Sequence, residues 1–381
     1  MRLLDRLADK RVVICVGSGG VGKTTLAAAL AVRAAADGRK TLALTIDPAR
    51  RLANSLGLEQ LDNVETRIDP DIFRRAGVEP RGELYGMMLD AKRTFDDLIR
   101  RIAPSDEAAQ RILDNTYYQT LSDALSGSQE YMAMEKLYEL QADRDYDLLV
   151  VDTPPTKHAL DFLEAPNRMA DFLDGKVIQW FVKPYLFAGK VGFAFAQRGA
   201  ALLFKMLERF TGYEAMADLA EFFLAFEGMY DGFKTRALRV KQMLGSSAAA
   251  FVLVTSPASP AIDEAEFFWT RLARERMTPE AVVFNRVHSL GQADHAAWAE
   301  QARRANDKLI ARFPAYAPAI DALIDNAVDV AVVAEADQRA IARFRARTDP
   351  QRPAYRVPAL ASDVHDLASL LALSEHVENE S

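Results

Sequence analysis

The segment from Gly17 to Thr25 reads GSGGVGKTT, and it constrains the fold of this chain more than any other feature. It fits the pattern G-x-x-x-x-G-K-[S/T], it follows the apolar run Val12 to Val16, and a helical pattern begins directly after it. Glycines let backbone N–H groups turn inward around an anion, and the N-terminus of the following helix adds to the positive field. The sequence therefore predicts an α/β fold with a phosphate-binding loop.

The loop pattern also assigns roles to side chains. Lys23 is expected to contact the β and γ phosphates, which makes it a predicted catalytic residue, and Thr24 is expected to bind a magnesium ion. Only one such loop occurs in the 381 residues, so we expect one site for ATP and Mg²⁺. The residues of this loop predicted to bind the nucleotide are Gly19, Gly20, Val21, Gly22, Lys23, Thr24 and Thr25.

A second candidate for metal binding is Asp152, which ends the apolar run Leu148 to Val151. A carboxylate in this position usually holds magnesium through water, although an aspartate that caps a loop is the alternative interpretation. The polar segment 153–158 that follows would lie near the γ phosphate, where it can sense the loss of that phosphate. We therefore expect a switch segment here.

Asp47 follows another predicted strand, Thr41 to Ile46. Because the carboxyl ends of parallel strands line the ligand crevice in such folds, Asp47 is a candidate for orienting the attacking water. Since Pro48 comes next, a helix-capping role for Asp47 is the alternative.

Several apolar runs lack the alternation of a half-exposed strand, which indicates strands that are covered on both faces. They are Thr41 to Ile46, Leu148 to Val151, Ala249 to Thr255 and Ala281 to Phe284. Together with the phosphate loop, they predict a mostly parallel, doubly wound sheet of the P-loop class.

Two long stretches between these strands, about 83–141 and 161–244, have helical character and exceed an ordinary crossover helix. We expect them to form a helical subdomain inserted into a single P-loop ATPase domain. The core of that domain, which spans 1–381 as a whole, is predicted to come from about 1–75, 145–160 and 245–381.

The composition narrows the function classes. A formal net charge of -7 argues against a protein that mainly holds the DNA or RNA backbone, so no nucleic-acid partner is expected. The single cysteine, Cys15, rules out an internal disulfide and a multi-cysteine metal site, and its apolar strand places it in the core. No export signal is found, and the apolar stretch 177–204 is interrupted by charges, so we expect a cytoplasmic protein without a transmembrane segment.

Taken together, these motifs resemble the ArsA and tail-anchored-protein targeting ATPases, which are deviant Walker A P-loop proteins that dimerise around nucleotide. The resemblance spans most of the chain. It is carried by the glycine-rich loop, Asp47-Pro48-Ala49, Asp152 to Thr156 followed by His158, Ala159, Leu160, Phe162 and Leu163, and Asn285 after a strand.

The resemblance implies roles that the residues alone do not establish. By it, Asp47 activates the water, Asp152 to Thr156 is the second switch, and Asn285 contacts the adenine. Without it, Asn285 is a polar residue at a strand end, where loop capping is the more common role.

The chain departs from this family at Ser18, where a lysine commonly reaches the partner's phosphates across the dimer. A cation supplied in trans contributes on the order of 10³ to 10⁵ in rate in related systems, so hydrolysis is expected to be slow or otherwise aided. Arg50, Arg51 and Lys157 are candidates for the missing charge, within a homodimer or across a heterodimer with a related ATPase. Because cysteine clusters are lacking, neither an arsenite site nor a zinc clasp is expected.

Phenylalanines concentrate between Asp171 and Phe233, which hold 11 of the chain's 20. This segment is interpreted as a groove for an apolar helical client, as a face for a membrane partner, or simply as helix packing. The leading hypothesis is a dimeric Mg-ATP-hydrolysing switch that moves this subdomain. The alternatives are a weakly active regulatory subunit that pairs with a second such ATPase or a membrane protein, and a partition or positioning ATPase.

Overall fold

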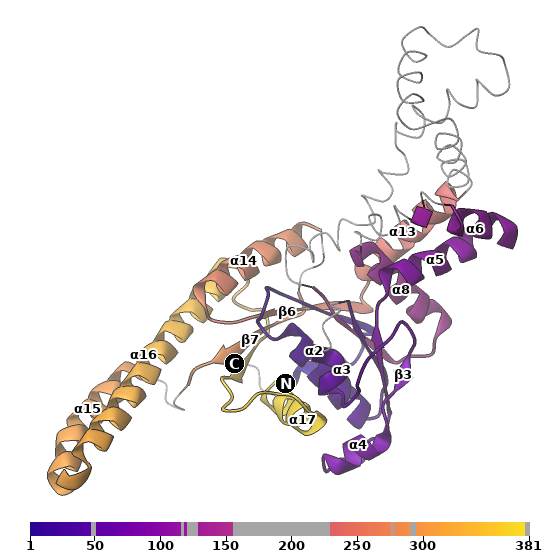
Figure 1. The fold of residues 1–381 in the computed structure, drawn as a ribbon. Coiled ribbons are helices and arrows are strands. Elements are labelled where there is room, and N and C mark those ends of the chain that lie inside the picture. Colours follow the sequence, from indigo (N-terminus) through magenta and orange to yellow (C-terminus); the bar gives the residue numbers. More distant parts are fainter. Residues whose placement is uncertain are drawn as a thin grey trace, which may run out of the picture. The chain divides into compact units, whose positions relative to one another are not determined.

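The computed structural model describes residues 1–46, 51–115, 118–119, 129–154, 229–275, 277, 279–289 and 295–377. The chain divides into two compact units (Figure 1). The first comprises Met1–Met88, Asp145–Leu160 and Gly245–Ser381, and the second comprises Leu89–Arg144 and Asp161–Leu244.

An 8-stranded sheet of order β3-β4-β2-β5-β1-β6-β7-β8 forms the centre of the first unit. Every neighbouring pair is parallel except β3 with β4. The strands are β1 Val12–Val16, β2 Lys40–Thr45, β3 Thr66–Arg67, β4 Glu83–Met88, β5 Leu148–Asp152, β6 Ala249–Thr255, β7 Ala281–Val287 and β8 Ala354–Pro358. The mostly parallel sheet of a P-loop α/β fold is thereby confirmed.

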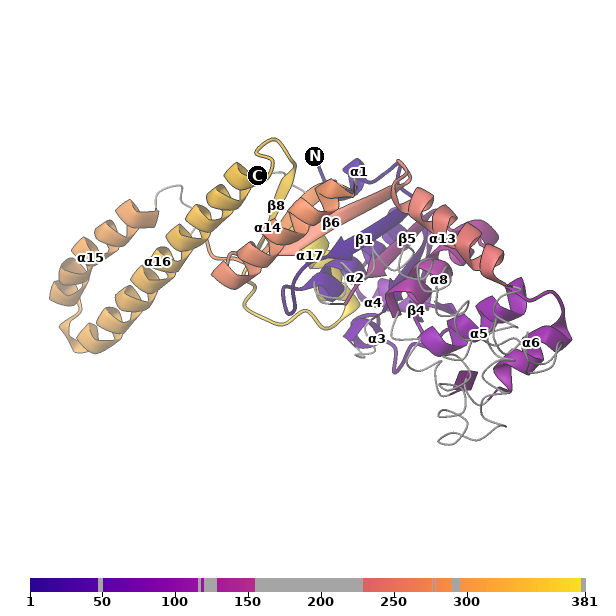
Figure 2. The same ribbon diagram turned by 90° about the horizontal axis from the view of Figure 1, so that it is seen from above.

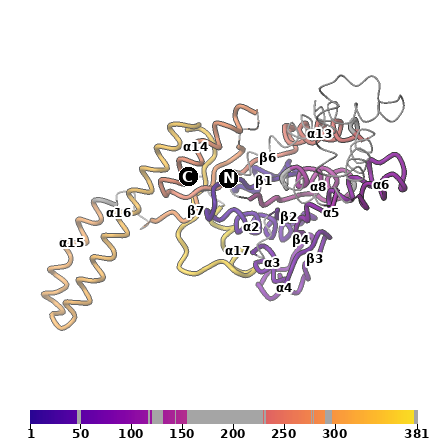
Figure 3. Tube along the Cα trace, turned by 45° about the horizontal axis from the view of Figure 1, so that its top comes forward, coloured from indigo at the N-terminus to yellow at the C-terminus, as the bar shows by residue number. Residues whose placement is uncertain are grey.

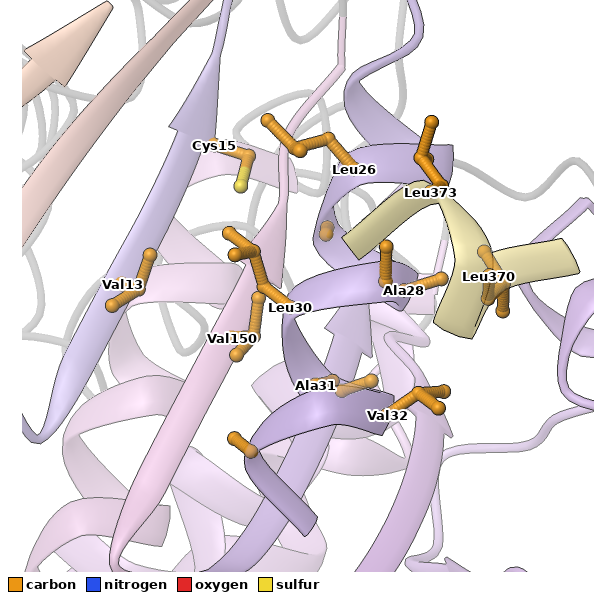
Figure 4. Close-up of a cluster of buried hydrophobic side chains, with 14 of the residues drawn as sticks. Val13, Cys15, Leu26, Ala28, Leu30, Ala31, Val32, Val150, Leu370 and Leu373 are labelled. Atoms are coloured by element: carbon orange, nitrogen blue, oxygen red, sulfur yellow. The ribbon is translucent and has the colours of Figure 1, made fainter. Parts of the chain in front are cut away.

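One face of this sheet is covered by α2 (Lys23–Ala36), whose many alanines allow close packing on the strands. The C-terminal helix α17 (Leu367–His376) packs against α2 in turn. In Figure 4, Leu370 of α17 lies beside α2, and Leu30 of α2 lies beside Val150 of β5. Shorter helices complete the unit: α1 Leu3–Arg6, α3 Arg51–Ser55 and α4 Pro70–Arg75.

The opposite face is covered near β7 by α14 (Ser259–Arg274) and by the C-terminal part of α16 (Ala317–Arg347). Phe284 of β7 meets Phe344 edge to face at 5.5 Å between ring centroids, and Phe344 meets Trp269 of α14 at 6.3 Å. Both faces of the inner strands are thus buried, which explains their unbroken apolar runs.

A helical hairpin precedes β8. It consists of α15 (His295–Arg312), a short turn of 3₁₀ helix η1 (Pro314–Tyr316) and the 31-residue α16. The two helices run side by side in two views (Figures 2 and 3). Ala299, Val328 and Ala331 form the small buried cluster between them.

In the second unit the described residues form helices: α5 Ala91–Ile102, α6 Asp106–Leu113, α8 Gln129–Asp143 and α13 Tyr230–Leu244. Side chains of Asp90 and Ser105 cap α5 and α6 at their N-termini. Tyr131, Met134 and Leu137 of α8 are fully buried, so the apolar face of this helix packs within the protein.

The prediction of a helical stretch over 83–141 was wrong for its first residues, because Glu83–Met88 forms β4 and pairs with β2 in parallel. Glutamate, leucine and methionine favour helices locally, but pairing and burial in the sheet outweigh that preference. Gly86 fits this position because a Cβ there would lie 2.8 Å from Cδ2 of Leu61. Most of the stretch 161–244 lies outside the described residues.

Among the described residues, no helix combines the length and the apolar character that crossing a membrane requires.

Candidate functional site

The predicted phosphate loop connects β1 to α2, and its glycines are required by geometry at two points. Gly22 precedes α2 with a φ of 97°, and a Cβ at this position would lie 2.2 Å from Nδ2 of Asn285. At Gly17 a Cβ would lie 2.0 Å from the carbonyl oxygen of Val254. A side chain at either position would therefore displace its neighbours.

Lys23 begins α2 and is buried, and its Nζ donates a hydrogen bond of 2.8 Å to the carbonyl oxygen of Ser18. The lysine thus folds back over its own loop. Within the described chain no side chain caps α2 at its N-terminus, and the first turn holds no acidic residue. The N–H groups of the first turn and the positive end of the helix suit a bound anion.

Asp152 lies at the carboxyl end of β5 and is almost completely buried. Its Oδ2 accepts hydrogen bonds from the hydroxyl groups of Thr24 at 2.7 Å and Thr45 at 3.1 Å. The strand register explains this meeting, because Asp152 pairs with Thr45 of β2 on one side and with Cys15 of β1 on the other. The structure therefore brings together the two predicted magnesium residues, Thr24 and Asp152.

The chemistry of these groups fits a magnesium ion. Hydroxyl and carboxylate oxygens are the hard donors that Mg²⁺ prefers, and the ion usually takes its remaining ligands from phosphates and water. The described residues contain no cluster of three or more histidine, cysteine, aspartate or glutamate side chains that could hold a metal ion. Thr24 and Asp152 are the residues that would hold the ion.

Asn285 reaches the phosphate loop from a bulge in β7. Its Nδ2 donates to the carbonyl oxygen of Val21 at 2.8 Å, and its Oδ1 accepts from the backbone N–H of Arg286 at 2.9 Å. Arg286 has a φ of 60°, and the register with β8 shifts between Phe284 and Val287. Bulges commonly re-aim side chains in this way. The predicted contact of Asn285 with adenine stays a prediction.

Cys15 is buried in β1, as predicted for a core residue. Burial raises the pKa of its thiol far above the ordinary value, and the nearby charge of Asp152 adds to the effect. Because a thiolate is the reactive form, this cysteine is an inert packing residue. Its carbonyl oxygen accepts a hydrogen bond of 2.8 Å from the hydroxyl group of Thr153.

Ser18, the residue that departs from the resembled family, is also buried. In the part of the chain that the structure describes, its Oγ makes no hydrogen bond. Of the cations suggested as a replacement for the missing lysine, Arg51 is exposed at the start of α3, whereas Arg50 and Lys157 lie outside the described residues.

Two more of the predicted elements fall outside the described residues: Asp47 with Pro48 and Ala49, and the switch segment beyond Pro154. Thr45 joins the site although sequence reasoning did not select it, whereas Thr153 begins the predicted switch segment. The signal for Thr45 was a polar residue at the end of an apolar strand.

The sequence profile of the anion-transporting ATPase family matches residues 10–315. The chain belongs to this family.

Among curated relatives, ATPase GET3 of Malassezia globosa is 29% identical over 167 residues, which cover 43% of this chain and 45% of that protein. ATPase BagA of Mycobacterium tuberculosis is 28% identical over 180 residues, 45% of this chain and 50% of the relative. A putative arsenical pump-driving ATPase of Halobacterium salinarum is 30% identical over 177 residues, 44% of this chain and 25% of the relative. The chain spans at most half the length of these relatives.

Proposed function

We propose that this family member binds Mg-ATP at the loop 17–25 and hydrolyses it. The observation that carries the proposal is the hydrogen bond between Thr24 and Asp152, which joins the two magnesium candidates beside the buried Lys23. Phosphate groups, magnesium and a lysine are the parts that phosphoryl transfer to water needs at one place.

In this proposal each residue has one task. The backbone N–H groups of the loop hold the phosphates, and Lys23 exchanges the carbonyl oxygen of Ser18 for the β and γ phosphates. Magnesium, held by Thr24 and Asp152, would neutralise charge on the phosphates. Asp47 orients the attacking water, and Asn285 contacts the adenine while it keeps its place beside the loop.

The biological role that we propose is a cytoplasmic switch. Two chains, either identical or a pair of related ATPases, would close around nucleotide, and Asp152 to Thr156 would pass the loss of the γ phosphate to the helical unit. That unit would hold an apolar helical client or contact a membrane protein. A switch of this kind needs a client affinity that differs between nucleotide states, because equal affinities shift no equilibrium.

The proposal is tested by calorimetric titration of ATP in the presence of Mg²⁺. Lys23→Ala should weaken ATP binding at least about tenfold, because a buried charge-assisted contact to phosphate is lost. Lys308→Ala, which removes an exposed lysine from α15, is the matched control and should bind like the parent. Equal affinity in all three proteins would refute binding at this loop.

A second candidate function is a regulatory subunit that binds ATP but hydrolyses it weakly. Ser18 favours this candidate, because a buried hydroxyl cannot supply the positive charge that the family's lysine provides. If adding a related ATPase that has the lysine accelerates hydrolysis manyfold, this candidate is supported.

The partition or positioning alternative is disfavoured by α17, the helix that such a protein would present to a membrane. Leu367, Leu370, Leu371 and Leu373 of α17 are buried, and the helix packs on α2. Its apolar face is therefore occupied.

A further inference from the structure

The hairpin α15–α16 carries an apolar stripe that the described residues of the chain cover only in part. From Tyr316, directly before α16, residues spaced alternately by four and three positions continue to Phe344. This spacing keeps side chains on one face of a helix, and it is the spacing through which helices pair in coiled coils and bundles. Its apolar residues are Tyr316, Ile320, Leu323, Ala327, Val330, Ala334, Ile341 and Phe344, and the charged residue Asp337 occupies one position of the same spacing.

The C-terminal part of the stripe belongs to the core of the first unit. Ile341 and Phe344 are each only 1% exposed, and Phe344 packs against Trp269 and Phe284. The N-terminal part of the stripe is exposed instead, since Tyr316 is 66% exposed and Leu323 is 68% exposed. The same stripe is thus buried in the C-terminal part of α16 and exposed in its N-terminal part.

The neighbouring helix α15 adds to this apolar surface. Leu309 and, just beyond the helix, Phe313 are exposed, and neither belongs to the small cluster of Ala299, Val328 and Ala331 that holds the hairpin together. Large apolar side chains gathered on one exposed segment are typical of an interaction site, whereas single ones are not.

Charge distribution along the hairpin indicates what this surface binds. The segment 295–312 has four lysines and arginines and two acidic residues, whereas 313–338 has five acidic residues and no lysine or arginine. Among the described residues no ion pair joins α15 to α16. A second hairpin related by a twofold axis along the helices would place α15 of one copy on α16 of the other, so that opposite net charges meet.

We propose that this apolar face binds the same face of a second copy of the chain, so that two hairpins form a four-helix bundle. The exposed part, 316–333, is about 27 Å long, and two helices that lie 8–10 Å apart present roughly 500 Å² per copy. Roughly 1,000 Å² in total lies at the lower end of specific interfaces. The acidic segment disfavours the other obvious occupant, an anionic membrane surface.

This contact extends the dimer proposed above but does not require nucleotide or hydrolysis. The test is sedimentation equilibrium of the full chain without nucleotide, for the parent, Leu323→Glu and Val332→Glu. Val332 is 56% exposed on the same helix but lies off the stripe, so it controls for the added charge and for loss of an apolar side chain. Circular dichroism checks that all three proteins are folded.

We expect the parent and Val332→Glu to dimerise alike, and we expect Leu323→Glu to raise the dissociation constant at least about tenfold. A parent that stays monomeric without nucleotide, or equal dissociation constants for the two variants, would overturn the inference. Binding of a monomeric parent to anionic vesicles, lost in Leu323→Glu, would assign the face to a membrane instead. Failure of ATP binding would refute the proposed function and leave this result unchanged.

Discussion

Thr24, Thr45 and Asp152 meet because neighbouring parallel strands end at the same edge of the sheet. Asp152 follows four buried apolar residues of β5, and the two hydroxyl groups that it accepts come from the start of α2 and the end of β2. The carboxylate is therefore fixed before any ligand arrives. Such preorganisation is what a metal and phosphate site needs at the scale of single residues.

Gly22 offers a prediction at this scale. Gly22→Ala should lower the free energy of unfolding by more than Gly77→Ala, since both positions have a left-handed φ but only Gly22 has a side chain, Asn285, where the Cβ would lie. The left-handed backbone alone costs about 1–2 kcal/mol for a non-glycine residue, and the contact with Asn285 adds to this. Denaturant unfolding of both variants measures the difference. Equal losses would show that Asn285 moves away without cost.

The residues that a local pattern defines were predictable, and those that depend on strand register were not. Lys23 and Thr24 follow from the loop pattern, and Asp152 follows from its place after an apolar strand. Thr45 joins the same carboxylate only because β2 pairs with β5 in the observed register, which no sequence pattern specifies. Asn285 required a family resemblance, since its direction depends on a bulge.

At the scale of elements, the second unit contains a buried ion pair between α8 and α13. Glu135 is 2% exposed and pairs with Arg236. Burial raises the pKa of the Glu135 carboxyl above its ordinary value, although Arg236 acts in the opposite direction. A group whose pKa is raised on folding binds more protons in the folded state, so its contribution to stability falls as pH rises above the ordinary value.

Arg236→Met should therefore destabilise the chain in a pH-dependent way. Removing one partner of a buried pair typically costs about 3–5 kcal/mol, because the other charge stays buried alone. The loss should be smaller at pH 5 than at pH 8, since the isolated Glu135 carboxyl can take up a proton at the lower pH. Thermal melts at both pH values, with Arg236→Lys as the control that keeps the charge, measure this. A loss that is independent of pH would contradict the account.

Element prediction succeeded where both local preference and burial agreed. The five predicted strands are present, and α8 lies in the first stretch predicted to be helical. β4 was predicted as helix because its residues prefer helices, and its pairing with β2 and β3 makes it a strand. The hairpin α15–α16 also depends on distant packing, since the end of α16 is held by Trp269 and Phe284.

At the scale of the whole molecule, the chain consists of a sheet unit that carries the candidate site and a second unit rich in helices, and it crosses between them after Met88, Arg144, Leu160 and Leu244. The first crossing follows β4, which pairs with β2, and the return after Arg144 leads into β5, which ends in Asp152. The sequence predicts an inserted helical subdomain, whereas it identifies neither a client nor a partner chain.

The most direct test of the proposed ATPase is single-turnover hydrolysis of bound Mg-ATP by the parent chain beside Asp47→Asn. We predict that the parent converts its bound ATP to ADP. We expect the variant to bind ATP normally but to hydrolyse it at least about a hundredfold more slowly, because the attacking water is no longer oriented. If the variant reacts at the parent's rate, Asp47 has no catalytic role. If the parent binds ATP without hydrolysing it, the claim that this chain is an ATPase on its own is contradicted.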